Sequence, residues 1–166
     1  MRADSQRLLD CIPRLRRYAR ALLGTAADAD DLVQDTVARG WDKLASWRQD
    51  SDMRAWLFGI MHNLHVDRLR RQPPAAEALD DNLPAAPSDP AARLVLRDLD
   101  TALRLLPPEQ REVLLLVALE ELSYQEVAAV LQIPPGTVMS RLSRGRERLR
   151  LLMEGQPLPS PLKVIK

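Results

Sequence analysis

The chain has 166 residues, with 24 Lys and Arg against 23 Asp and Glu, and a formal net charge of +1. A charge this close to zero excludes nucleic-acid binding through a global positive field, so any such binding must come from local patches. Cys11 is the one cysteine, which excludes an internal disulfide and favours a reducing compartment. With no apolar run of membrane-spanning length and no hydrophobic signal core at the N-terminus, we expect a cytoplasmic protein without membrane insertion.

Aromatic residues make up only 4% of the sequence, and its apolar residues recur at helical rather than strand spacing, which predicts an all-α fold. Residues 4–23 form the first helical pattern, and Pro13 inside it predicts a kink or two helices. A second pattern covers residues 26–46. Its first half is crowded with acidic and amide side chains: Asp28, Asp30, Asp31, Gln34 and Asp35. These residues fit a plain helix start or an acidic docking surface equally well.

Ser46 to Asp52 reads as a polar loop that contains Trp47, and an exposed Trp is costly unless it packs or stacks on something. A third helix is predicted over about 53–71. One strip of it carries Trp56, Asn63, Asp67, Arg70 and Arg71. Such a strip suits the stacking and hydrogen bonding of single-stranded bases. Equally, Trp56 could belong to the core while the arginines complement the helix dipole.

His62 and His65 form the only pair of residues that would suit a metal, at a spacing of three along the helix. No third His or Cys lies near them in the sequence, so we do not expect a metal site. The glycines are isolated rather than grouped in a phosphate-binding loop. We expect neither catalytic residues nor a cofactor.

Residues 72–88 are dominated by Pro, Ala and acidic side chains, which predicts a flexible linker and a domain boundary. Asp89 and Pro90 then fit the cap and first turn of a helix that runs to about Leu106. Another helix is predicted over 109–121.

Ser123 to Arg150 has the pattern of two short helices joined by a tight turn. Ser123 and Glu126 form a capping box, and Ile133-Pro134-Pro135-Gly136 ends one helix and opens the next. The second helix has an apolar face and a neighbouring face of Thr137, Arg141, Arg144 and Arg148. Residues 135–150 hold five Arg and one Glu, a formal charge of +4. The alternative is a solvated basic face on a core helix. We favour a DNA-binding helix-turn-helix because turn, capping box and charge stripe coincide.

Together these segments predict two small helical domains joined by a Pro/Ala-rich linker, the C-terminal one a four-helix domain ending in a helix-turn-helix. The expected divisions are 1–71, the linker 72–88, the second domain 89–155 and a tail 156–166.

The chain resembles bacterial RNA polymerase sigma factors of the extracytoplasmic-function type, in the sigma-70 family. Residues 28–41, DADDLVQDTVARGW, look like the polymerase-docking segment of region 2. Residues 53–71 look like its melting and minus-10 segment, and residues 106–150 look like the minus-35 domain, region 4. The resemblance covers nearly the whole chain apart from the linker and the tail.

The resemblance implies a role for each group of residues. Asp31, Gln34 and Asp35 would contact the clamp coiled coil of the largest polymerase subunit, with the flap of the second largest as a further contact. Trp47 and Asn63 would hold a base flipped from the minus-10 strand, beside Asp67, Arg70 and Arg71. Minus-35 bases would be read by Met139, Ser140, Ser143 and Arg144, with Thr137, Arg141 and Arg148 contacting phosphates or supporting the helix.

The resemblance therefore implies a sigma factor that directs core RNA polymerase to promoter DNA, duplex and single-stranded, under the control of an anti-sigma factor. Met139 and Gly145 depart from the family pattern, which has a basic residue and an alanine there. Two alternatives stand beside it: a helix-turn-helix regulator that acts without polymerase, and a sigma mimic that titrates an anti-sigma factor.

Overall fold

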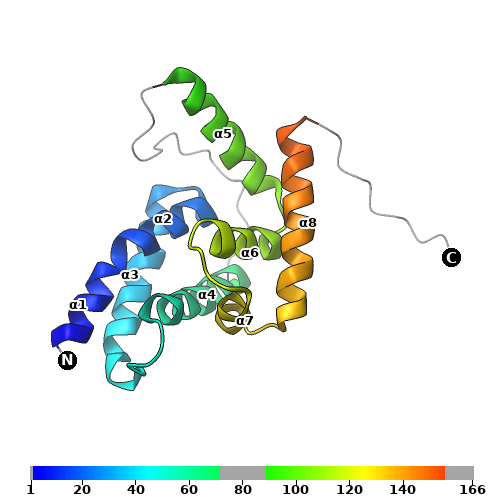
Figure 1. Ribbon diagram of the computed structural model, residues 1–166. Helices are drawn as coiled ribbons and strands as arrows, with labels where there is room; N and C mark the ends of the chain where they lie inside the picture. The colour runs from blue at the N-terminus through cyan, green and yellow to red at the C-terminus, as the bar shows by residue number, and fades with distance from the viewer. Residues whose placement is uncertain (1, 72–88, 156–166) are drawn as a thin grey trace.

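The computed structural model describes residues 2–71 and 89–155, which are all-α (Figure 1). The predicted linker, 72–88, and the predicted tail lie outside the described residues. The first part of the chain forms α1 (Arg2–Asp10), α2 (Ile12–Leu23), α3 (Ala26–Asp42), the short 3-10 helix η1 (Leu44–Ser46) and α4 (Met53–Arg71). The second part forms α5 (Pro90–Leu105), α6 (Pro108–Ala118), α7 (Tyr124–Leu131) and α8 (Pro135–Met153).

Proline and capping residues set the helix boundaries as the sequence predicted. The break between α1 and α2 falls at Cys11, so Pro13 lies in the first turn of α2, where its missing N–H costs nothing. Asp89 caps α5 by accepting a hydrogen bond from the Ala91 N–H at 3.1 Å, with Pro90 at the first helical position. The predicted two-helix solution for residues 4–23 is confirmed.

The N-terminal domain packs α1, α2 and α4 around α3. Its core is lined by Leu15, Leu32, Leu57 and Met61, all fully buried. Tyr18 and Phe58 meet edge to face with ring centroids 4.9 Å apart. Together these contacts place the exposed faces of α3 and α4 on one rigid body.

The C-terminal domain is built on α6, which is buried on most sides and packs against α8. Val113 and Leu116 of α6 and Val138 and Leu142 of α8 are nearly inaccessible to solvent. Helix α7 joins this core through Val127 and Val130. Four helices ending in a helix-turn-helix are therefore present, as predicted.

The two domains touch, which the sequence did not indicate. Helix α4 packs against α7, and α2 packs against α6 (Figure 1). Buried apolar residues of both domains join in one cluster. Among the described helices, none has the length and apolar character needed to cross a membrane.

Candidate nucleic-acid and polymerase interfaces

Helix α7 and the turn after it set the orientation of α8. The Ser123 hydroxyl accepts from the Glu126 N–H at 3.1 Å, and the Glu126 carboxylate accepts from the Ser123 N–H at 2.7 Å. This reciprocal pair is the capping box that the sequence predicted. At the other end, Gln132 ends α7 in the left-handed conformation with φ of 55°. Helix α8 then begins at Pro135.

Helix α8 has one buried face and one open face. Val138, Leu142 and Gly145 form the buried face against α6. At Gly145 an added Cβ would make ordinary van der Waals contacts, with the Gln110 Cβ at 3.4 Å and the Leu114 side chain at 3.6 Å. Helix α8 is therefore packed against α6 on the side opposite to its exposed face.

The open face of α8 carries the residues expected to read bases. Met139, Ser140, Ser143 and Arg144 are all exposed, and Met139 exposes 56% of its surface. Thr137, Arg141 and Arg148, expected at phosphates, are half-buried beside them. The structure gives Arg144 no ion-pair partner among the described residues, so its guanidinium is available to a ligand.

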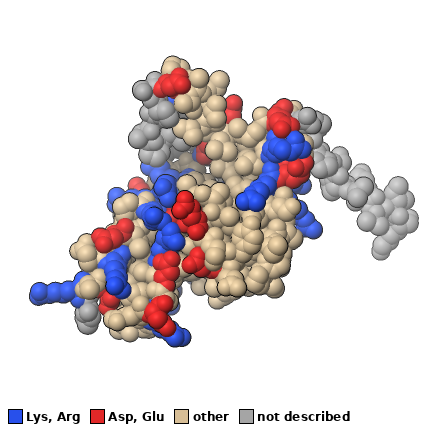
Figure 2. Space-filling view, in the orientation of Figure 1, with Lys and Arg blue, Asp and Glu red and all other residues tan. Residues whose placement is uncertain are grey.

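The C-terminal end of α8 carries acidic as well as basic side chains. Arg150 pairs with Glu147 at 2.7 Å and with Glu154 at 2.9 Å, and these hydrogen bonds raise the pKa of its guanidinium. Figure 2 shows the acidic and basic side chains next to each other at this end of the helix. The other arginines of the helix, Arg141, Arg144, Arg146 and Arg148, lie in its middle, between the N-terminal turns and this paired end.

The predicted minus-10 residues fall into two environments. Asn63, Asp67, Arg70 and Arg71 lie exposed along α4, as expected of a strand-binding strip. Trp47 is different: it is only 8% exposed and belongs to the core, and the Arg7 guanidinium covers its ring at 5.9 Å from the centroid.

In this conformation Trp47 therefore packs on the core of the N-terminal domain, and its contact with a base stays a prediction. Its indole N–H is also buried, with no hydrogen-bond partner among the residues that the structure describes. Because Arg7 caps the ring, a base could stack on Trp47 only after that side chain moved. Trp56, which the sequence left open between core and surface, is half-buried against the core.

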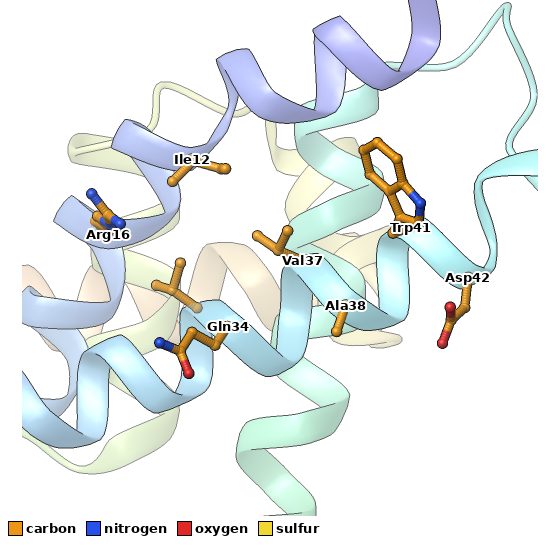
Figure 3. Close-up of a pocket in the computed structure, with 8 residues that line it drawn as sticks. Ile12, Arg16, Gln34, Val37, Ala38, Trp41 and Asp42 are labelled. Atoms are coloured by element: carbon orange, nitrogen blue, oxygen red, sulfur yellow. The ribbon is translucent and has the colours of Figure 1, made fainter. Parts of the chain in front are cut away.

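The predicted docking residues on α3, Asp31, Gln34 and Asp35, are all exposed, and their spacing of three and four puts them on one side of the helix. Gln34 lines an open apolar groove between α2 and α3, together with Ile12, Val37 and Trp41 (Figure 3). Asp35 instead faces α4, where it forms an ion pair with Arg68. Asp31 is exposed near the start of the helix.

Sequence reasoning missed Trp41. Half of its surface is exposed at the rim of the groove, although the adjacent Gly40 is buried. The adjacent glycine explains why Trp41 is exposed: at Gly40 an added Cβ would lie 2.7 Å from a Leu57 methyl group. The contact between α3 and α4 is made at the glycine, and the bulky indole is left outside it.

The two histidines do not form a site of their own. His65 is buried, and burial lowers the pKa of its imidazole against the opposing effect of Glu112. His62 Nδ1 lies 2.7 Å from Glu112 Oε1, across the boundary between the two domains. Within residues 2–71 and 89–155 there is no group of three His, Cys, Asp or Glu side chains placed to hold a metal ion.

Two family models match separate parts of the chain. Residues 8–62 match the sigma2 domain of PhyR, and residues 96–149 match sigma-70, region 4. The first range covers α3 and the first half of α4, and the second covers α6, α7 and most of α8.

Curated relatives and solved structures extend the likeness over most of the chain. The ECF RNA polymerase sigma factor EcfG of Rhodopseudomonas palustris is 36% identical over 150 residues, which cover 88% of this chain and 82% of that protein. The sigma factor RpoE of Bartonella quintana, solved in complex with the anti-sigma factor NepR, superposes with a TM-score of 0.78 at 30% identity. That match covers 93% of this chain and 98% of the other.

A more distant structure shares the fold. PhyR of Bartonella quintana, described as an anti-anti-sigma factor and solved in complex with NepR, has a TM-score of 0.60 at 17% identity. It covers 87% of this chain but only 48% of PhyR.

Proposed function

The chain belongs to the extracytoplasmic-function family of RNA polymerase sigma factors, and from this membership we propose how its surfaces divide the work of promoter recognition. A protein of this family directs core RNA polymerase to promoter DNA and starts transcription. We infer that α8 reads the minus-35 element, that α4 holds the minus-10 strand, and that α3 docks on polymerase. No bond is made or broken by the chain itself in this scheme.

One observation supports the minus-35 assignment above the others. Arg144 stands unpaired on the open face of a helix whose opposite face is fixed against α6. A guanidinium in a major groove can bind the two acceptors of a guanine at once, and each such pair contributes about 1–3 kcal/mol of discrimination. Ser140 and Ser143, on the same face, are small enough to let the helix approach the bases.

The minus-10 assignment rests on Asn63. Its amide is exposed on α4 beside Asp67, and an amide can donate to and accept from the edge of a flipped base. Arg70 and Arg71 follow at the helix end, where they suit the strand backbone. Trp47 contributes in this proposal only through the packing of the loop that precedes α4.

The polymerase contact is proposed for the α2–α3 groove and its rim. Gln34 and Asp31 contribute polar groups, and Trp41 adds an exposed aromatic surface of the kind enriched at protein interfaces. The finer assignments, to the clamp coiled coil of the largest subunit and the flap of the second largest, follow from the family resemblance. Control by an anti-sigma factor is proposed because RpoE is solved with NepR.

Run-off transcription tests the proposal directly. Purified core polymerase with this protein and a pool of genomic fragments should give discrete transcripts, and Arg144→Ala should change which fragments are used. Glu109→Ala, a change at an exposed residue in the first turn of α6, serves as the control. Transcripts that are absent with the wild-type protein would contradict the assignment.

A sigma mimic is the second candidate function, because the family model that matches residues 8–62 is that of PhyR. A mimic would bind an anti-sigma factor through the same helices but would leave core polymerase unchanged. The transcription assay separates the two: a mimic gives no transcript alone, yet restores transcription when added to an inhibited sigma factor.

A further inference from the structure

Helix α8 exposes one large apolar side chain in its first two turns. Met139 leaves 56% of its surface open to solvent, whereas Val138 beside it is fully buried. A single exposed methionine is common on protein surfaces. Here, however, it stands on the second helix of a helix-turn-helix, whose first turns lie against base edges in the major groove. The chemistry of this side chain therefore decides what the helix can read at that place.

The surroundings of Met139 on the helix surface are small and uncharged. The neighbours of a helical residue lie three and four positions away, and for Met139 these include Pro135, Gly136 and Ser143, all exposed. A Cβ added at Gly136 would meet nothing within 4 Å. Met139 is therefore the one large side chain on a neutral part of the open face.

Hydrogen-bonding groups are scarce at this end of α8. From Pro135 to Ser140 the sequence has no charged side chain. The Ser140 hydroxyl already donates to the Thr137 carbonyl oxygen at 3.4 Å, and the sulfur of Met139 is only a weak acceptor. The start of the helix thus offers a neutral, mainly apolar contact, in contrast to the guanidinium of Arg144 further along.

One feature of the major groove matches such a contact. Thymine alone among the four bases carries a methyl group, at C5, on its major-groove edge. Covering that methyl group with an apolar side chain is favourable by a factor of about four in affinity. Against the nitrogen and oxygen atoms of the other bases, the same side chain would displace water without replacing its hydrogen bonds. An unbranched thioether also adapts its shape to the surface that it covers.

We propose that Met139 selects thymine in the minus-35 element by covering the C5-methyl group of one base. This inference deepens the proposed function and rests on it, because it requires α8 to lie in the major groove. Met139 and Arg144 are five residues apart, which is about 7.5 Å along the helix axis, or the length of about two base pairs. The thymine is therefore expected about two base pairs from the base that Arg144 contacts.

Replacement of thymine by uracil tests the methyl group alone, since uracil keeps the hydrogen-bonding groups of thymine. Core polymerase carrying the complete chain selects duplexes from a pool that is randomised over the minus-35 region. Each thymine of the preferred duplex is then replaced singly by deoxyuridine, and binding is measured by competition. At one position we expect the wild-type protein to bind about fourfold more weakly. That position should lie about two base pairs from the one at which Arg144→Ala relaxes the selection.

Two variants and a matched control assign the effect to Met139. Met139→Ala lacks the atoms that cover the methyl group, so its ratio of thymine to uracil affinity should be close to one. Met139→Leu keeps an apolar side chain of similar size and should retain most of the ratio. Met153→Ala changes another exposed methionine, in the last turn of α8, and should keep the wild-type ratio. Alanine and leucine favour helix, and Met139 is exposed, so the Met139 variants should fold.

The outcomes separate this proposal from the function on which it rests. A thymine whose methyl group matters only when Met139 or leucine is present supports the proposal. Selected duplexes that bind equally well with uracil at every minus-35 thymine overturn it and leave the proposed function intact. So does a sensitivity to uracil that Met139→Ala retains in full. A polymerase complex that selects no sequence at all contradicts the proposed function, and this assignment with it.

Discussion

Three glycines beyond the first turns of their helices allow the packing of the fold to be tested quantitatively. Gly40, Gly59 and Gly145 lie in α3, α4 and α8, and each replacement by alanine gains about 0.5–1 kcal/mol of helix stability. Their surroundings differ. A Cβ at Gly59 meets nothing within 4 Å, whereas at Gly40 it lies 2.7 Å from a methyl group of Leu57.

The expected order of stability follows from those distances. Gly59→Ala should stabilise by about 1 kcal/mol, which raises the Tm by about 2–4 °C for a chain of this size. Gly40→Ala should destabilise by about 1 kcal/mol, because Leu57 is fully buried and overpacking costs about 1–3 kcal/mol against the helix gain. Gly145→Ala should fall between them, since its nearest contact is 3.4 Å.

Urea unfolding followed by circular dichroism at 222 nm measures all three variants under one condition. A change in midpoint at constant slope reports stability alone. If Gly40→Ala were stabilised as much as Gly59→Ala, the close approach of α3 to α4 at this position would be wrong.

Three further predictions concern function and pH. Arg144→Ala should cost about 1–3 kcal/mol of discrimination among minus-35 sequences in competition binding, and an equal loss on every sequence would assign Arg144 to phosphate instead. Asn63→Ala should reduce permanganate reactivity at the minus-10 region while duplex binding stays unchanged; unaltered reactivity would argue against the base contact. Burial lowers the pKa of His65 in the folded state, so the unfolded chain binds more protons and the free energy of unfolding should fall as pH drops below about 6.5. In urea titrations at several pH values, His65→Gln should reduce this dependence of stability on pH. An unchanged dependence would assign it to other groups.

Much of the helical architecture could be predicted because its signals are local. The split at Cys11, the caps at Asp89 and Ser123, and the start of α8 after Pro134 each depend on residues a few positions apart. Proline geometry and side-chain caps act at that range, so one sequence is enough to find them.

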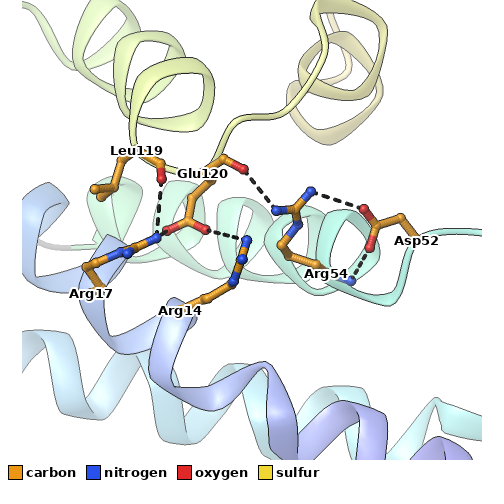
Figure 4. Close-up of polar contacts among 6 residues, drawn as sticks. All are labelled: Arg14, Arg17, Asp52, Arg54, Leu119 and Glu120. Carbon is orange, nitrogen blue, oxygen red and sulfur yellow. Dashed lines mark hydrogen bonds and ion pairs between the residues drawn. The ribbon is translucent and has the colours of Figure 1, made fainter.

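The contacts between domains could not be predicted in the same way. Glu120 is one acidic residue in a polar turn, and nothing in its neighbours indicates that arginines more than a hundred residues earlier will bury it (Figure 4). The exposure of Trp41 and the burial of Trp47 could not be predicted for a related reason. Helical spacing predicts only which side of a helix a residue lies on. Whether each indole reaches solvent depends on tertiary contacts: the close packing of Gly40 on Leu57 beside Trp41, and the Arg7 guanidinium over the ring of Trp47.

The pairing of Arg150 with Glu147 and Glu154 limits the grip of α8 on DNA. Arg141 and Arg148 are the arginines of α8 proposed at phosphates, so about two counterions would leave the duplex when the helix binds. Affinity would then fall with salt at a slope of only about −2 on a log–log scale. An isolated C-terminal domain should consequently hold promoters weakly at physiological ionic strength, and useful residence on a gene would depend on the enzyme that carries it there.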